Sequence, residues 1–202
     1  GELIIEKQHL KREYERLQTG IDEMIELILR LIEYSKPQLS IHMREVANIT
    51  EKICISLNLE HEITQLLKRA SFLHDIGKIE NSQEGDRESV KRHPILGEAF
   101  IASIGILSPL ANIIRSHHER YDGTGFPDRL RGDEILLGSR IIAVADTIAI
   151  LTNNGSLLDL QQIVGELSSK AGHSLDPQIV NAVIHEINRN LTTENTPFMP
   201  VQ

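Results

Sequence analysis

Histidine and aspartate side chains that could bind metal ions recur along the sequence in short groups separated by long intervals. His74-Asp75 and His117-His118 are adjacent pairs, and each follows a stretch whose apolar residues have helical spacing. Imidazole and carboxylate groups are ligands that first-row divalent metals accept. The full candidate set is His42, His74, Asp75, His93, His117, His118 and Asp146. These residue types predict a metal centre whose ligands come from separate helices.

The spacing of the candidates favours a helical bundle. Successive groups are 32, 19, 24 and 28 residues apart, unlike the tight ligand pairs of a zinc finger. Such intervals fit facing helices that project ligands toward a shared centre. Asp146 interrupts the apolar stretch IIAVADTIAI, where a buried carboxylate needs a partner such as a cation. Seven candidates exceed the needs of one four-coordinate ion, so we expect two metals, although each residue alone also fits an ordinary core or surface role.

Composition excludes several classes of protein. The 202 residues include 21 basic and 29 acidic side chains, a formal net charge of −8, which argues against binding to duplex nucleic acid. No apolar run reaches the length of a membrane span. Cys54 is the single cysteine, which excludes an internal disulfide and predicts a cytoplasmic location. The chain begins with Gly and has no secretory signal, so we expect a fragment of a longer protein.

A seven-residue repeat predicts one long N-terminal helix over 1–34. Its d positions are apolar, and two of its four a positions are isoleucine, which favours a parallel two-stranded coiled coil and hence a homodimer. Lys7 at an a position weakens the coil there. Packing of residues 21–34 on the chain's own domain is an equally weighted alternative. The d positions are Leu3, Leu10, Leu17, Met24 and Leu31.

The rest of the chain predicts an all-α domain over 35–192, followed by a loose tail over 193–202. Asp176 before Pro177 is a typical helix start. No segment alternates as a strand would, so we expect no sheet. Two long polar loops, 79–90 and 120–134, are candidates for covering a site. Helices are expected near 38–58, 60–75, 87–104, 107–119, 135–153, 156–171 and 176–191.

The order of motifs resembles the HD-GYP family of the HD phosphohydrolase superfamily, over residues 36–190. The motifs are His42, HDIGK at 74–78, HPILG at 93–97, HHERYDGTGFP at 117–127 and Asp146 within AVADT. The resemblance implies an HD-type helical bundle preceded by the N-terminal coil, in a bacterial signalling protein with an upstream sensor or receiver domain. It also implies hydrolysis of cyclic di-GMP to linear pGpG or GMP, with two divalent ions, iron or manganese.

The resemblance assigns roles to individual residues. His42, His74, Asp75 and Asp146 would hold one metal, and Asp75 would bridge to a second metal held by His93, His117 and His118. A water shared by the metals would attack phosphorus, with Asp75 and Lys78 as catalytic residues. Lys78, Gly125, Phe126 and Pro127 would contact substrate. Apart from the resemblance, the position of Glu119 directly after His118 predicts that it orients His117 or His118, and a solvated side chain is an equally weighted alternative.

Several positions depart from the family pattern and leave the substrate open. Phe126 replaces the Tyr of Gly-Tyr-Pro, and Ala149 replaces a second Asp. Thr152-Asn153-Asn154-Gly155 replaces an Arg-Pro-Tyr-Arg stretch, and Lys36 and Gln38 replace acidic residues. Two alternatives therefore remain beside cyclic di-GMP hydrolysis. One is hydrolysis of another cyclic dinucleotide, and the other is a catalytically silent module that binds a metal or nucleotide.

Overall fold

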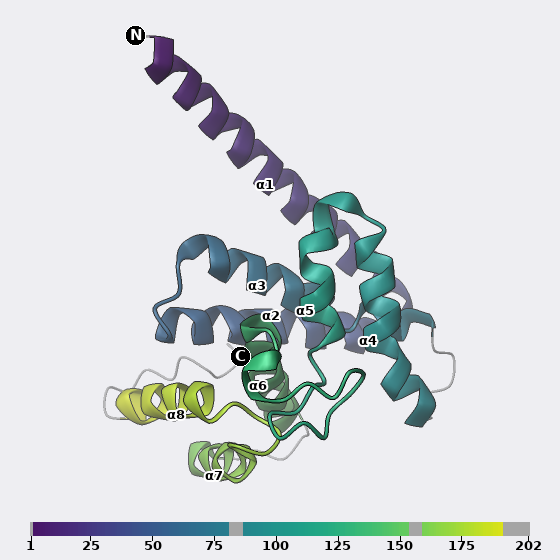
Figure 1. Ribbon diagram of the computed structural model, residues 1–202, viewed down its shortest axis with the longest axis vertical. Coiled ribbons are helices and arrows are strands. Elements are labelled where there is room, and N and C mark those ends of the chain that lie inside the picture. The colour runs from purple at the N-terminus through teal and green to yellow at the C-terminus, as the bar shows by residue number, and fades with distance from the viewer. Residues whose placement is uncertain (1, 81–86, 154–158, 192–202) are drawn as a thin grey trace.

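The computed structural model describes residues 2–80, 87–153 and 159–191 (Figure 1). Within these ranges the structure contains α-helices, 3-10 helices and loops, with one isolated bridge between Ala171 and Leu175 in place of any strand. The all-α prediction is therefore confirmed. The elements are α1 (Glu2–Ser35), α2 (Pro37–Ser56), α3 (His61–Leu73), η1 (Ile76–Glu80), α4 (Arg87–Ala102), η2 (Gly105–Leu110), α5 (Ala111–Arg115), η3 (Gly132–Glu134), α6 (Leu137–Asn153), α7 (Leu160–Lys170) and α8 (Pro177–Leu191).

The first helix has two different environments along its length. Its N-terminal half extends away from the other helices, whereas its C-terminal half runs alongside them (Figure 1). The buried side chains of α1 lie only in this second half, and they join the common core. They are Ile21, Ile25, Leu29 and Ile32. Within residues 21–34, one face of the helix thus packs on the chain's own domain, as the alternative interpretation of the repeat predicts.

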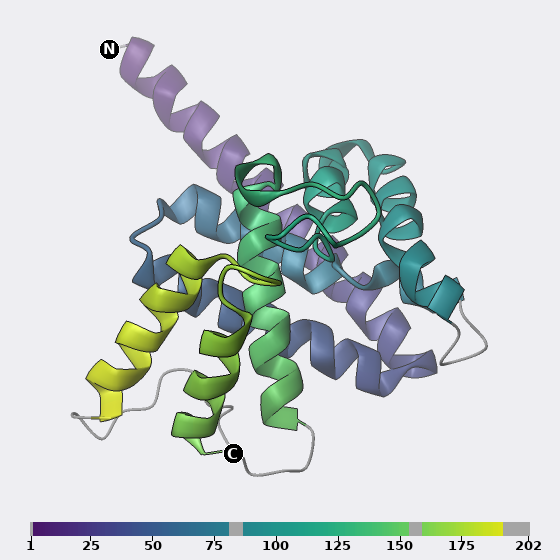
Figure 2. The same cartoon turned by 60° about the horizontal axis from the view of Figure 1, so that its bottom comes forward.

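The helical body is centred on α2, α3 and α6, which pack against one another. In Figure 2, α6 runs through the middle, with α4 and α5 on one side and α7 and α8 on the other. Aliphatic side chains fill this core, as the scarcity of aromatic residues predicts. Cys54 of α2 lies within it, and burial raises the pKa of its thiol to about 12.

The prediction of a single helix over 107–119 is wrong. The structure has η2 up to Leu110, a short α5 that ends at Arg115, and then a turn that carries His117 and His118. Pro109 lies inside η2, and proline removes a backbone donor that a continuing α-helix needs. The two histidines therefore come from irregular backbone rather than from a helix end.

Other boundaries agree closely with the sequence. Pro37 occupies the first turn of α2 directly after the break at Lys36. The carboxylate of Asp176 accepts a hydrogen bond from the backbone of Gln178 at 2.8 Å, so the predicted start of α8 is confirmed. The predicted tail over 193–202 lies outside the described residues, and the division into coil and domain stays a prediction. None of the helices described is both long enough and apolar enough to span a bilayer.

Candidate metal centre

The structure brings all seven predicted ligand residues together in two adjoining groups. Within each group the ligand atoms lie within 4.8 Å of one another. They come from the first half of α2, the segment after α3, the middle of α4, the turn after α5, and the middle of α6. One group is His42, His74 and Asp146, and the other is Asp75, His93, His117 and His118.

Asp75 lies between the two groups. Its Oδ1 is 3.1 Å from Nε2 of His93 and 3.7 Å from Nε2 of His117. Its Oδ2 is 3.3 Å from Nε2 of His74 and 3.7 Å from Nε2 of His42. One carboxylate oxygen thus faces each group, which is the arrangement that a bridging ligand needs.

The first group pairs an imidazole with a second carboxylate. Nε2 of His42 lies 3.0 Å from Oδ1 of Asp146. Burial raises the pKa of the Asp146 carboxyl, but the hydrogen bond from His42 and the charge of His74 lower it overall. Asp146 is therefore ionised and available as an anionic ligand.

The second group gathers three imidazole nitrogens at short range. Nε2 of His93 lies 3.3 Å from Nε2 of His117 and 3.1 Å from Nε2 of His118. Burial lowers the pKa of His117, and burial together with the neighbouring His117 lowers that of His118 much further. Neutral rings with converging nitrogens are the form of histidine that binds a metal.

Backbone carbonyls fix which nitrogen of two rings is available. Nδ1 of His117 lies 2.6 Å from the carbonyl of Ile114, and Nδ1 of His74 lies 2.7 Å from that of Ser71. Because a carbonyl oxygen only accepts, each Nδ1 donates, and Nε2 is left as the nitrogen with which each ring can bind a metal.

Several buried polar atoms at the centre have no hydrogen-bond partner, which indicates whether the site suits a cation. Nε2 of His74, Oδ1 of Asp75 and Nδ1 of His93 are buried without a hydrogen-bond partner. A buried polar atom in this condition is costly unless it binds something. Burial raises the pKa of Asp75, but His74 and the other histidines lower it well below its usual range, so the carboxylate is anionic. Two of these unpaired atoms, on His74 and Asp75, are ligand atoms of the centre, and a divalent cation satisfies them.

A glycine allows the two sides of the centre to approach. A Cβ added at Gly77 would overlap the backbone carbonyl of His93. The backbone of η1, which follows Asp75, therefore packs directly on α4. The HDIGK motif contains this glycine, but its spatial role depends on α4 and is not visible in the sequence.

Lys78 contacts the Asp75 carboxylate, and its backbone carbonyl is hydrogen-bonded to the residue that precedes α2. Its Nζ donates to Oδ2 of Asp75 at 2.5 Å. The Nζ of Lys36 donates to the backbone carbonyl of Lys78 at 2.7 Å. Lys36 was noted in the sequence only as a departure from the family pattern, so this contact was missed.

Glu119 anchors the loop that follows α5. It is buried, and its two carboxylate oxygens accept hydrogen bonds from the backbone of Asp128 at 2.6 Å and of Leu130 at 3.1 Å. This differs from the two roles considered from the sequence, solvation and orientation of a histidine. The loop returns to the centre at Phe126, whose ring lies 5.0 Å from that of His118.

The positions that depart from the family pattern lie in different surroundings. Ala149 is fully buried in the core, and Gln38 is exposed on the first turn of α2. Residues 154 and 155 of the altered stretch lie outside the described residues. Gly125 and Pro127, which flank Phe126, line a hollow beside the centre.

An all-helical domain with this ordered set of histidines and aspartates defines a class of metal-binding HD proteins. The sequence profile of the HD domain family matches residues 26–179, and the chain belongs to that family. The predicted family resemblance is therefore confirmed.

Relatives with curated names are phosphodiesterases. The chain is 29% identical over 177 residues to the cyclic di-GMP phosphodiesterase response regulator RpfG of Xanthomonas campestris, covering 80% of this chain and 47% of that protein. It is 27% identical over 172 residues to the 3'3'-cGAMP-specific phosphodiesterase 3 of Vibrio cholerae, covering 79% of this chain and 37% of that protein. The chain thus spans less than half the length of these two relatives.

A solved structure shows the same fold. Bd1817, an HDG"Y"P protein from Bdellovibrio bacteriovorus, superposes with a TM-score of 0.64 at 18% identity. The match covers 85% of this chain and 64% of that chain. At this level of identity the likeness supports the helical architecture alone.

Proposed function

We propose that this chain is a metal-dependent phosphodiesterase domain that hydrolyses a cyclic dinucleotide, with cyclic di-GMP as the first candidate. The observation that carries the proposal is the position of Asp75, with one oxygen toward each of two metal-binding groups. Hydrolysis adds water across one P–O ester bond and gives the linear dinucleotide pGpG, and a second cleavage gives GMP.

The proposed ligands are those of the two groups, with Asp75 shared, and iron or manganese suits these nitrogen and oxygen donors. Bound divalent ions supply positive charge for the phosphoryl oxygens and lower the pKa of a water molecule. In the protein, the carbonyls of Ile114 and Ser71 hold two of the rings in the tautomer that presents Nε2. Lys78 adds a cation beside Asp75, where it is placed to contact a substrate phosphate.

A second candidate is another cyclic dinucleotide, such as the mixed guanine–adenine form. Phe126 lacks the hydroxyl of the family's tyrosine, and Ala149 offers no carboxylate. These changes alter the groups expected near a base and leave the ligand positions filled. A catalytically silent module remains the third candidate.

Turnover assays separate these candidates. Protein loaded anaerobically with Fe(II) or Mn(II) is incubated with cyclic di-GMP, 3'3'-cGAMP or cyclic di-AMP, and products are separated chromatographically. Asp75→Ala serves as the blank. Hydrolysis that is absent from the blank supports the proposal, and the preferred nucleotide decides between the first two candidates. Full metal occupancy without turnover of any of the three overturns it in favour of the silent module.

We also propose that α1 forms a parallel homodimer and links the domain to an upstream sensor or receiver in a longer cytoplasmic protein. The d positions Leu3, Leu10 and Leu17 in the first half of α1 are 82%, 71% and 56% exposed. In the second half, Ile21, Met24 and Ile28 of the same repeat contact the core, so the proposed dimer contact lies in the first half. Glu6 and Lys11 flank this stripe at positions that face each other across a parallel pair. Sedimentation that shows only monomer at high micromolar concentration would overturn the dimer.

A further inference from the structure

A hollow of about 650 Å3 lies beside the three-histidine group, between α4 and the loop after α5. Its α4 wall is a single face of that helix, with residues spaced i, i+3, i+4 and i+7. The size is typical of a small-molecule site. The α4 wall consists of Glu88, Lys91, Arg92 and Ile95, and the loop wall of residues 123–127 and Arg129.

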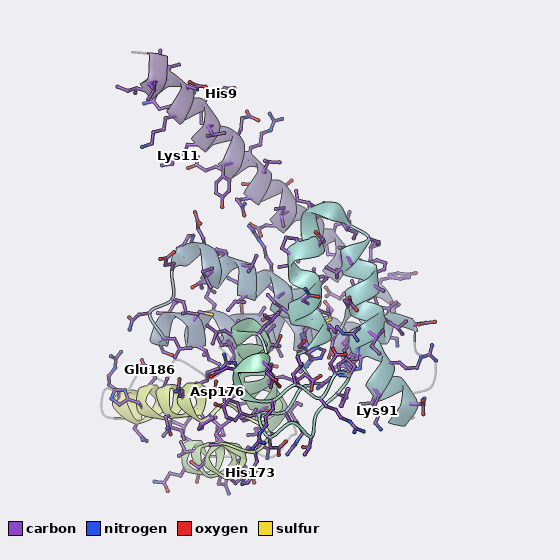
Figure 3. The ribbon with its side chains drawn as sticks, in the orientation of Figure 1. His9, Lys11, Lys91, His173, Asp176 and Glu186 are labelled. Carbon is purple, nitrogen blue, oxygen red and sulfur yellow. The ribbon has the colours of Figure 1, made fainter. Side chains whose placement is uncertain are left out.

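The hollow adjoins the metal centre at two points. Phe126 forms part of its wall, and the ring of Phe126 lies 5.0 Å from that of His118. On the other wall, Arg92 directly precedes His93 in α4. Figure 3 shows Lys91 near the end of α4 where this wall lies. A ligand larger than one phosphodiester at the centre would therefore extend past Phe126 into the hollow.

The hollow is positively charged in an acidic protein. Among its described lining residues, three are cations and Glu88 is the one carboxylate. Two acids of the loop are engaged elsewhere, because Asp128 pairs with Arg115 and Asp122 bonds to Thr124 and Arg120. Within the ranges that the structure describes, no ion pair is formed by the three cations, which are Lys91, Arg92 and Arg129.

We propose that this hollow binds the half of the cyclic dinucleotide that is not being cleaved. A cyclic dinucleotide has two phosphodiester groups, and only one can occupy the centre at a time. The second phosphate then lies near Lys91, Arg92 and Arg129, and the aromatic face of Phe126 packs against the attached nucleoside. This inference rests on the proposed function, since it assumes a substrate with two phosphates.

Charge reversal tests the inference by binding and by kinetics. The variants are Lys91→Glu, Arg92→Glu, their double variant and Arg129→Glu. The control is Arg16→Glu on the exposed part of α1, which alters the net charge of the chain by the same amount as each single variant. Binding of fluorescently labelled cyclic di-GMP to metal-free protein is measured by anisotropy. KM and kcat are measured on the Mn(II)-loaded protein.

We expect the double variant to bind the labelled nucleotide about tenfold more weakly, because two charge-assisted contacts are lost. KM for the cyclic dinucleotide should rise by a similar factor, with a smaller change in kcat. Hydrolysis of bis(p-nitrophenyl) phosphate, which has a single phosphate, should be affected less than hydrolysis of the dinucleotide. Arg16→Glu should match the wild-type protein in every assay.

The outcomes separate this inference from the proposed function. If the wild-type protein hydrolyses the dinucleotide and the variants keep its KM and its binding affinity, the proposed role of the hollow is wrong. The proposed function is then unaffected. If hydrolysis of the dinucleotide and of bis(p-nitrophenyl) phosphate falls by the same factor, the proposed role of the hollow is also wrong, because the cations would then act at the metal centre itself. Charge-dependent binding without turnover of any cyclic dinucleotide supports the hollow and overturns the proposed function. If the wild-type protein shows no binding and no turnover of any cyclic dinucleotide, both the inference and the proposed function are overturned.

Discussion

Lys36 donates a hydrogen bond from its Nζ to the backbone carbonyl of Lys78 at 2.7 Å. Lys36 lies between the end of α1 and the start of α2, and Lys78 lies in η1, hydrogen-bonded to Asp75. The contact therefore connects the end of the long helix directly to the candidate centre. A displacement of α1 at this junction would therefore reach η1 through this hydrogen bond.

The first prediction concerns this contact. Lys36→Met should speed amide hydrogen exchange in η1 by about tenfold, because one hydrogen bond that holds its carbonyl is lost. Exchange is followed by mass spectrometry in the metal-free protein. Lys52→Met in α2 is the control and should leave hydrogen exchange in η1 unchanged. Equal exchange in the Lys36 variant and the wild-type protein would show that the contact does not hold η1.

The second prediction separates the two ligand groups by metal content. His42→Ala should lose one metal ion, His118→Ala the other, and Asp75→Asn both, since Asp75 has one oxygen toward each group. Metal per chain is counted by elemental analysis after loading and desalting. His173→Ala is the control, because His173 lies by α7, apart from both groups (Figure 3). Unaltered stoichiometry in the Asp75 variant would contradict a bridging role.

The third prediction concerns the close approach of η1 and α4. Gly77→Ala should destabilise the fold by about 2 kcal/mol, because the added methyl forces the η1 backbone away from His93. It should also weaken metal binding. Gly165→Ala is the matched control, since nothing lies within 4 Å of a Cβ there and alanine favours a helix by about 1 kcal/mol. Urea denaturation of both variants provides the measurement. If Gly77→Ala is as stable as the wild-type protein, the backbone near His93 can shift to accommodate the added methyl group.

The fourth prediction is a pH dependence. Glu26 of α1 accepts two hydrogen bonds from Arg44 of α2, which lower the pKa of its carboxyl from 4.5 to about 2. Because the folded pKa is the lower one, the pair stabilises the protein above pH 4.5, and this stabilisation is lost as the pH falls toward 2. Solvent screening limits the effect to about 1 kcal/mol, since the Glu26 side chain is 41% exposed.

Urea denaturation between pH 3 and pH 7 measures this effect. The stability difference between the wild-type protein and Glu26→Gln should be largest at pH 7 and should shrink below pH 4.5. Glu23→Gln, an exposed position on the same helix, should show little difference at any pH. A constant difference for Glu26→Gln across the range would contradict the assignment.

Residue types and order were sufficient to predict the helical class and the seven residues that meet at the centre. The apolar periodicity fixes most helix boundaries to within a few residues, and Pro37 and Asp176 mark two of them. The turn that carries His117 was not predicted, because α5 ends at Arg115 with no glycine or proline to mark the end in the sequence.

Hydrogen bonds from side chains to distant backbone groups could not be predicted from the sequence. Glu119 hydrogen-bonds to loop amides 9 and 11 residues away, and Lys36 reaches a carbonyl 42 residues away. Neither pairing leaves a periodic or compositional signal. Gly77 was placed within a motif, but its role depends on the position of α4, which only the folded structure provides.

The burial of Cys54 makes the full chain suitable for site-directed spin labelling. The native thiol is fully buried and has a pKa of about 12, so it should not compete for a methanethiosulfonate reagent at neutral pH. His9→Cys on the projecting part of α1 would then be the one reactive cysteine in each copy (Figure 3). Dipolar spectroscopy on this variant can therefore measure whether two α1 helices lie side by side, without first removing a cysteine from the core.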